Sequence, residues 1–384
     1  MFEVHQRRGL PRRRAFIVLV PLAVIALACA PEASRASPST AGLAGVNLNG
    51  PILAVSDAVL RSEFKRMSAA GVRRIRLPVN WEFVQPVEGR GPILHWLDRI
   101  ALLAARSKID LLPFVFGAPT WAAAPATLCR RCGSNLLVSA HQPRDPARYA
   151  QFVASLVARY GPGGSLWKAS KKLPARPVKA WQVWNEPDLA SYWPTDGWAS
   201  EYADLLRLTF KAIRAVDPSA TVVLAGLTNY SPAALAALLY QGKIFGYFNV
   251  AAMNLFTVKV ADQSVVLAKF RDELVRGGGA TIPIWITEWT WLSGASRATW
   301  AFPPVIANDK LLETVGQTVA LYRRSLNNGD RLRAAYWYSW ATTYQTDSPF
   351  EYAGLNRLSD ARRVVPKPAL RAWQAAIASK SSAR

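Results

Sequence analysis

Residues 178–188 read VKAWQVWNEPD, a nearly continuous apolar run that ends in Asn185, Glu186 and Asp188. An apolar run without polar alternation is typical of a strand that is covered on both faces. We therefore predict a buried strand with Asn185 and Glu186 at its C-terminal end.

Seven other segments repeat this pattern, and amphipathic stretches that predict helices separate them. The eight predicted strands cover residues 43–49, 73–81, 109–116, 178–184, 221–227, 248–256, 282–289 and 332–340. Strands that alternate with helices predict a parallel sheet with right-handed crossovers, and eight such units predict a single (β/α)8 TIM barrel of the α/β class. An open doubly wound sheet is the alternative, although no glycine-rich phosphate loop follows the first strand.

The composition excludes several classes of protein. Of the 384 residues, 51% are hydrophobic and 19% are charged, which is too apolar for a disordered chain. The formal net charge is +22, but the basic residues are scattered and no nucleic-acid-binding motif occurs. We expect no nucleic-acid partner. The positive charge favours contact with acidic surfaces or acidic glycans, and solubility alone is the other explanation.

The first 30 residues resemble an export signal. Arginines at 12, 13 and 14 precede an apolar run from Ala15 to Ala28, which small residues follow. We expect residues 1–30 to be the signal, 31–40 a linker and 41–384 the barrel, and the protein to be secreted or held outside the cytoplasmic membrane. An uncleaved membrane anchor and a lipoprotein signal before Cys29 are the alternatives.

Two glutamates stand at the ends of predicted strands, Glu186 on the fourth and Glu288 on the seventh. In a TIM barrel the C-terminal strand ends form the active site. A pair of carboxyl groups there suits glycosidic bond cleavage, in which one group donates a proton and the other attacks the anomeric carbon. The alternative is that both are structural acids that cap neighbouring loops.

Many of the 15 tryptophans fall at or beyond the same strand ends. Sugar rings pack their C–H faces on aromatic faces, so these side chains are candidates for substrate contacts, with loop packing as the alternative. The candidates are Trp81, Trp121, Trp289 and Trp337.

The segments RLPVNW (76–81), WQVWNEPD (181–188) and WITEW (285–289) together resemble glycoside hydrolases of clan A, nearest to the family 39 group of β-xylosidases and exopolysaccharide hydrolases. The resemblance extends from about residue 43 to 373. It implies a retaining hydrolase of β-linked glycans that needs no metal or organic cofactor. We expect a monomer that acts on an oligo- or polysaccharide.

The resemblance also implies roles for individual residues. Glu186 would be the general acid/base and Glu288 the nucleophile, with Arg76 keeping Glu288 ionised. Asn185 would hold the sugar 2-hydroxyl, and Trp337 would form the floor of the sugar subsite.

The sequence departs from the family pattern on the sixth strand, where relatives usually read His-Pro-Tyr and this chain reads Asn254-Leu255-Phe256. The missing tyrosine hydroxyl predicts a raised pKa for Glu288. The departure also motivates a second hypothesis, namely an inactive or weakly active carbohydrate-binding protein on the same barrel.

Cys129 and Cys132 form a CxxC pair in the loop after the third predicted strand. A local disulfide is expected for an exported chain, with a metal site or free thiols as alternatives. His141 is the only nearby histidine, which argues against a four-ligand zinc site.

Overall fold

The computed structural model describes residues 40–125, 140–171, 173–228, 231–294, 303–345, 348–360 and 363–379. The predicted export signal and the pair Cys129–Cys132 lie outside these residues. None of the helices in the described ranges has the length and apolar composition that a membrane crossing requires.

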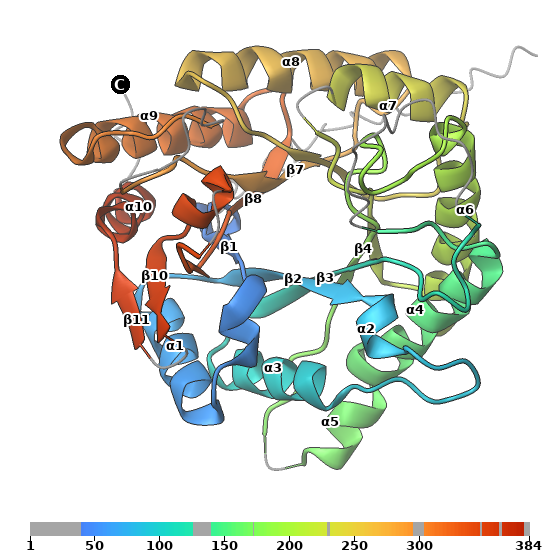
Figure 1. Cartoon of the computed structure of the whole chain (residues 1–384). Coiled ribbons are helices and arrows are strands. Elements are labelled where there is room, and N and C mark those ends of the chain that lie inside the picture. Colours follow the sequence, from blue (N-terminus) through green and yellow to red (C-terminus); the bar gives the residue numbers. More distant parts are fainter. Residues whose placement is uncertain are drawn as a thin grey trace, which may run out of the picture. The chain divides into compact units, whose positions relative to one another are not determined.

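Eight parallel strands form the central barrel (Figure 1). The sheet order is β5-β4-β3-β2-β1-β8-β7-β6, and parallel bridges from Val223 to Val250 and from Leu227 to Met253 join its two ends. The predicted TIM barrel is thus confirmed. The strands are shorter than their apolar runs: β1 (Gly45–Asn47), β2 (Arg74–Asn80), β3 (Asp110–Phe116), β4 (Ala180–Val183), β5 (Thr221–Val223), β6 (Ala251–Asn254), β7 (Ile284–Trp289) and β8 (Leu332–Trp337).

Helices surround the strands, as the amphipathic stretches predict (Figure 1). Helix α4 shows the local cause. The Asp145 side chain accepts a hydrogen bond from the Ala147 amide at 2.8 Å, Pro146 takes the first helical position, and the helix ends before Gly161. The helices are α1 (Asp57–Ala69), α2 (Trp81–Val84), α3 (His95–Arg106), α4 (Pro146–Tyr160), α5 (Ser165–Ala169), α6 (Trp198–Val216), α7 (Ser231–Tyr240), α8 (Val260–Arg276), α9 (Asn308–Asn327) and α10 (Pro368–Ala378).

A small second sheet follows β8 and was not predicted. It consists of β9 (Ala341–Thr342), β10 (Asn356–Ser359) and β11 (Arg363–Pro366), with β10 and β11 antiparallel. The Arg66 side chain of α1 ties this sheet to the barrel through the Asn356 side chain and the Val364 carbonyl. Strands of two to four residues carry too little alternation to be recognised from sequence.

The interior of the barrel is filled by its own apolar cluster, which is distinct from the core between strands and helices. It contains Leu112, Val223, Val250, Ala252, Ala334 and Tyr336. Side chains alternate along a strand, so Arg74, Arg76 and Pro78 of β2 follow one another on its inner face. The apolar cluster leaves room for one cavity at each end of the barrel.

Candidate active site

A cavity of about 180 Å³ lies at the C-terminal ends of the strands. Residues on or shortly after β1, β2, β3, β4, β7 and β8 contribute to it. Its lining consists of Asn47, Asn49, Arg76, Pro78, Phe114, Phe116, Asn185, Glu186, Tyr192, Glu288 and Tyr338. Both predicted glutamates are therefore in the same cavity.

Arg76 is the centre of the polar network below this cavity. Its side chain is fully buried, and its Nη1 donates to Glu288 Oε1 at 2.5 Å. Its Nη2 donates to Asn185 Oδ1 at 2.6 Å, and its Nε donates to Gln182 Oε1 at 2.6 Å. The guanidinium carbon also lies 3.8 Å from the centroid of the Phe114 ring. A buried charge needs this compensation, because desolvation is costly without it.

Glu186 is held from a different strand. Asn254 of β6 donates its Nδ2 to Glu186 Oε1 at 2.7 Å, and Thr287 Oγ1 donates to Asn254 Oδ1 at 2.8 Å. The Asn254 amide thus lies between Glu186 and Thr287. The backbone at Glu186 has φ 44°, a left-handed conformation that is uncommon for a residue with a Cβ and that recurs at functional sites.

The two carboxyl groups have unequal electrostatic environments. Burial, with the negative charge of Glu288 as the next cause, raises the pKa of Glu186 to about 8. Burial also raises the pKa of Glu288, but the adjacent Arg76 guanidinium opposes that effect. The Arg76 guanidinium therefore favours the ionised form of Glu288, whereas burial and the charge of Glu288 favour the protonated form of Glu186.

Four tryptophans that were predicted to contact substrate do not line the cavity. Trp81 packs on Phe152 and on Trp121, away from the glutamates. Trp289 and Trp337 are fully buried and pack on each other, and the Trp337 indole donates to the Ala353 carbonyl at 2.8 Å.

The aromatic side chains that do line the cavity are Phe114, Phe116, Tyr192 and Tyr338. Tyr338 directly follows Trp337, and the alternation of side chains explains why one faces the cavity and the other faces the helices. The sequence motif identified the right strand end but not the side of the strand that each residue occupies. The hydroxyl of Tyr338 accepts a hydrogen bond from Asn49 Nδ2 at 3.0 Å.

Phe256 contributes no hydroxyl to the site, as the sequence indicates. Its ring lies edge-on to Tyr338, with centroids 6.2 Å apart, and packs on Phe350. The raised pKa of Glu288 agrees in direction with the expectation, but burial is its main cause. The described residues hold no cluster of three or more His, Cys, Asp or Glu side chains that suits a metal ion.

Solved structures share this barrel. A family 39 glycoside hydrolase from Bacteroides cellulosilyticus WH2 matches with a TM-score of 0.60 and 17% identity, over 88% of this chain and 64% of its own. A monomeric β-xylosidase from Caulobacter crescentus CB15 matches with a TM-score of 0.63 and 16% identity, over 90% of this chain and 70% of its own. A family 51 α-L-arabinofuranosidase from Bifidobacterium longum matches with a TM-score of 0.59 and 12% identity, over 89% of this chain and 74% of its own.

These likenesses establish the fold and agree with the clan A resemblance in the sequence. The chain spans less than two thirds of the Bacteroides enzyme, which is correspondingly longer. Neither the scan of protein-family models nor the search of curated sequences gives a match. The activity of this chain must therefore be argued from its own site.

Gly226 provides a test of the site geometry. A Cβ at this position would lie 2.5 Å from Asn254 Oδ1 and 2.6 Å from Thr287 Oγ1, so Gly226→Ala should push the two side chains apart. We expect Asn254 to lose its contact with Glu186 and the variant to lose about 1–3 kcal/mol of unfolding free energy through overpacking. Chemical denaturation measures the loss.

Gly316→Ala is the matched control, since a Cβ at Gly316 of α9 meets no atom within 4 Å. It should stabilise the protein by about 0.5–1 kcal/mol, because alanine is the better helix former. Equal stability of the two variants would show that the site does not need the close approach at Gly226.

Proposed function

We propose that this protein is a retaining glycoside hydrolase that cleaves β-linked glycans through Glu186 and Glu288. The observation that carries the proposal is the placement of both carboxyl groups in one cavity with unequal surroundings, one beside an arginine and one beside an amide. Pairs of titratable groups whose environments separate their pKa values divide the roles of acid and base.

In the first step Glu288 attacks the anomeric carbon while Glu186 gives its proton to the leaving glycosidic oxygen. The C–O bond to the leaving group breaks as the bond to Glu288 forms, which gives a covalent glycosyl-enzyme. In the second step Glu186, now ionised, takes a proton from water. The water oxygen displaces Glu288 and restores both carboxyl groups.

Two amide side chains orient this chemistry. The oxygen of Asn185 accepts from Arg76, so its NH2 group is left to donate to a sugar hydroxyl near the reacting carbon. Asn254 occupies Glu186 Oε1, which places the proton of Glu186 on Oε2. Tyr338 and Tyr192 supply aromatic surface for the sugar ring.

Paired variants test the two roles. Glu288→Gln should abolish turnover of every substrate, because no glycosyl-enzyme can form. Glu186→Gln should lower turnover of natural glycans by about 10²–10⁴-fold but spare the first step on activated aryl glycosides, whose leaving group needs no proton. Added azide should rescue Glu186→Gln and leave Glu288→Gln inactive, and release of the aryl group measures both.

The alternative function, a carbohydrate-binding protein, gives a different pattern in the same experiment. Wild-type protein would then release no product, and glycan affinity would survive both glutamine variants. Turnover that is unchanged in Glu288→Gln would refute the assignment of the nucleophile.

The pH dependence follows from the two carboxyl groups. Glu186 acts while protonated, so kcat/KM should fall as the pH rises through about 8. Glu288 acts while ionised, so kcat/KM should also fall at acid pH. The pKa of this acidic limb of the pH profile should lie above the ordinary glutamate pKa, because burial raises the pKa of Glu288. The hydrogen bond from Asn254 favours ionised Glu186, and Asn254→Ala should therefore move the basic limb to higher pH.

Asn308→Ala, at the exposed start of α9, is the control and should leave both limbs in place. A basic limb that stays fixed in Asn254→Ala would assign that limb to a group other than Glu186.

We also propose that residues 1–30 direct export and that the mature protein acts on extracellular polysaccharide as a monomer. The arginine-led apolar segment and the positive net charge support this. N-terminal sequencing of protein recovered outside the cytoplasm should find a start between about residues 29 and 40, as small-residue cleavage sites predict. An intact N-terminus in the cytosolic fraction would contradict export.

A further inference from the structure

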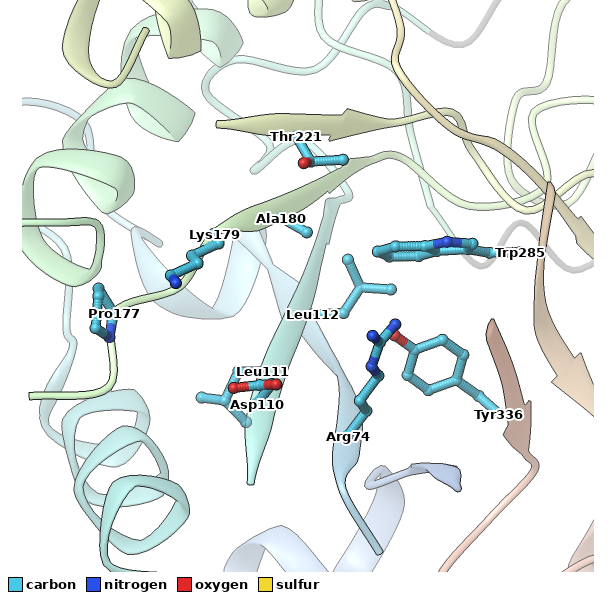
Figure 2. A pocket seen from close by; sticks show the side chains of 10 residues that line it. All are labelled: Arg74, Asp110, Leu111, Leu112, Pro177, Lys179, Ala180, Thr221, Trp285 and Tyr336. Atoms are coloured by element: carbon cyan, nitrogen blue, oxygen red, sulfur yellow. The ribbon is translucent and has the colours of Figure 1, made fainter. Parts of the chain in front are cut away.

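A second cavity, of about 230 Å³, opens at the other end of the barrel, where the strands begin (Figure 2). Its lining comes from β2, β3, β4, β5, β7 and β8. The lining residues are Arg74, Asp110, Leu111, Leu112, Pro177, Lys179, Ala180, Thr221, Trp285 and Tyr336. Leu112 and Tyr336 of this lining also belong to the apolar cluster inside the barrel, and neither glutamate is among the lining residues.

One wall of this cavity is aromatic. The Trp285 ring is partly exposed, and its centroid lies 6.3 Å from that of Tyr336. The Arg74 guanidinium carbon lies 5.6 Å from the Trp285 ring centroid, and Figure 2 shows this group beside the Tyr336 hydroxyl. The Arg74 guanidinium thus lies over one ring and beside the hydroxyl group of the other, in the lining of the cavity.

The lining of this cavity carries two cationic side chains, Arg74 and Lys179, and one carboxylate, Asp110. Among the described residues, neither Arg74 nor Lys179 forms an ion pair, whereas Asp110 is paired with Arg176 at 2.8 Å. Arg76, two residues along the same strand, shows the contrast, because Glu288 neutralises it. An anion entering this end of the barrel would meet two cations and one carboxylate that is already paired.

We propose that this cavity is a second binding site, for a sugar unit that carries a carboxylate, as in the uronate residues of acidic polysaccharides. The aromatic wall suits the C–H face of a pyranose ring, Arg74 and Lys179 suit its carboxylate, and Thr221 offers a hydroxyl. A neutral sugar would leave the two cations unused, and an inorganic anion would leave the aromatic wall unused.

The size of the cavity agrees with this occupant. It is larger than the 180 Å³ cavity that is proposed to hold one reacting sugar ring, so a single ring fits. A ring bound here lies at the opposite end of the barrel from the reacting bond. The site would therefore hold the protein on an acidic polymer, and it stands whether or not the glutamates are catalytic.

Isothermal titration of the full chain with a trigalacturonate tests the proposal, in Glu288→Gln protein so that no turnover intervenes. Trp285→Ala and Lys179→Glu should each weaken binding by about tenfold or more, the loss expected for a contact to a charged group or a stacking ring. Lys179 is exposed, so its variant should keep the fold, which circular dichroism checks. Raised salt should weaken binding of the trimer to a similar extent. The methyl-esterified trimer, which carries no carboxylate, should also bind more weakly than the free acid.

The control is Arg61→Met, an exposed arginine of α1, which should leave affinity for the trimer unchanged, and Tyr338→Ala in the other cavity distinguishes the two sites. Loss of binding in Tyr338→Ala but not in Lys179→Glu would place the ligand at the glutamates and overturn the proposal. The absence of any measurable binding, or equal binding of the ester, would overturn it too. Activity of the unsubstituted protein on aryl glycosides is measured separately. The proposed hydrolase activity and the proposed second binding site are therefore tested independently of each other.

Discussion

The ion pair between Arg76 and Glu288 is the constraint on which the site depends. Both side chains are buried at the barrel's centre, where an uncompensated charge would be costly. The pair is tolerated because Gln182 and Asn185, both from the region of β4, and Asn47 of β1 accept further guanidinium N–H groups. Removing either partner would leave a buried charge, so strands β2, β4 and β7 are held in one arrangement by electrostatics as well as by packing.

The pair also determines the proton on the neighbouring carboxyl group. Burial is the main cause of the raised pKa of Glu186, and the negative charge of Glu288, which Arg76 stabilises, raises it further. Asn254 limits that rise by donating to Glu186, and Thr287, adjacent to Glu288 in sequence, orients Asn254. The chain thus couples its two glutamates through one amide from β6, the strand on which it departs from the His-Pro-Tyr pattern of the resemblance.

The sequence predicted all eight barrel strands because each is an apolar run bounded by polar residues, and it predicted where both glutamates lie because each closes such a run. It did not predict which aromatic side chains line the cavity. Trp337 and Tyr338 are adjacent, and only the register of β8 decides that Tyr338 faces Asn49 while Trp337 faces Trp289. The small sheet was missed for a related reason, since its strands gain their stability from pairing and not from a pattern of their own.

Strand β2 places two arginines on the axis of the barrel, and their surroundings differ in a way that local sequence does not reveal. Arg76 meets a carboxylate because β7 carries Glu288 next to its last residue, whereas Arg74 meets Trp285, which lies near the start of β7. A cation over an indole face is stabilised without being neutralised, so Arg74 keeps its positive charge without a carboxylate partner among the described residues. The same two strands therefore give an arginine paired with a carboxylate at one end of the barrel and an arginine over an indole ring at the other.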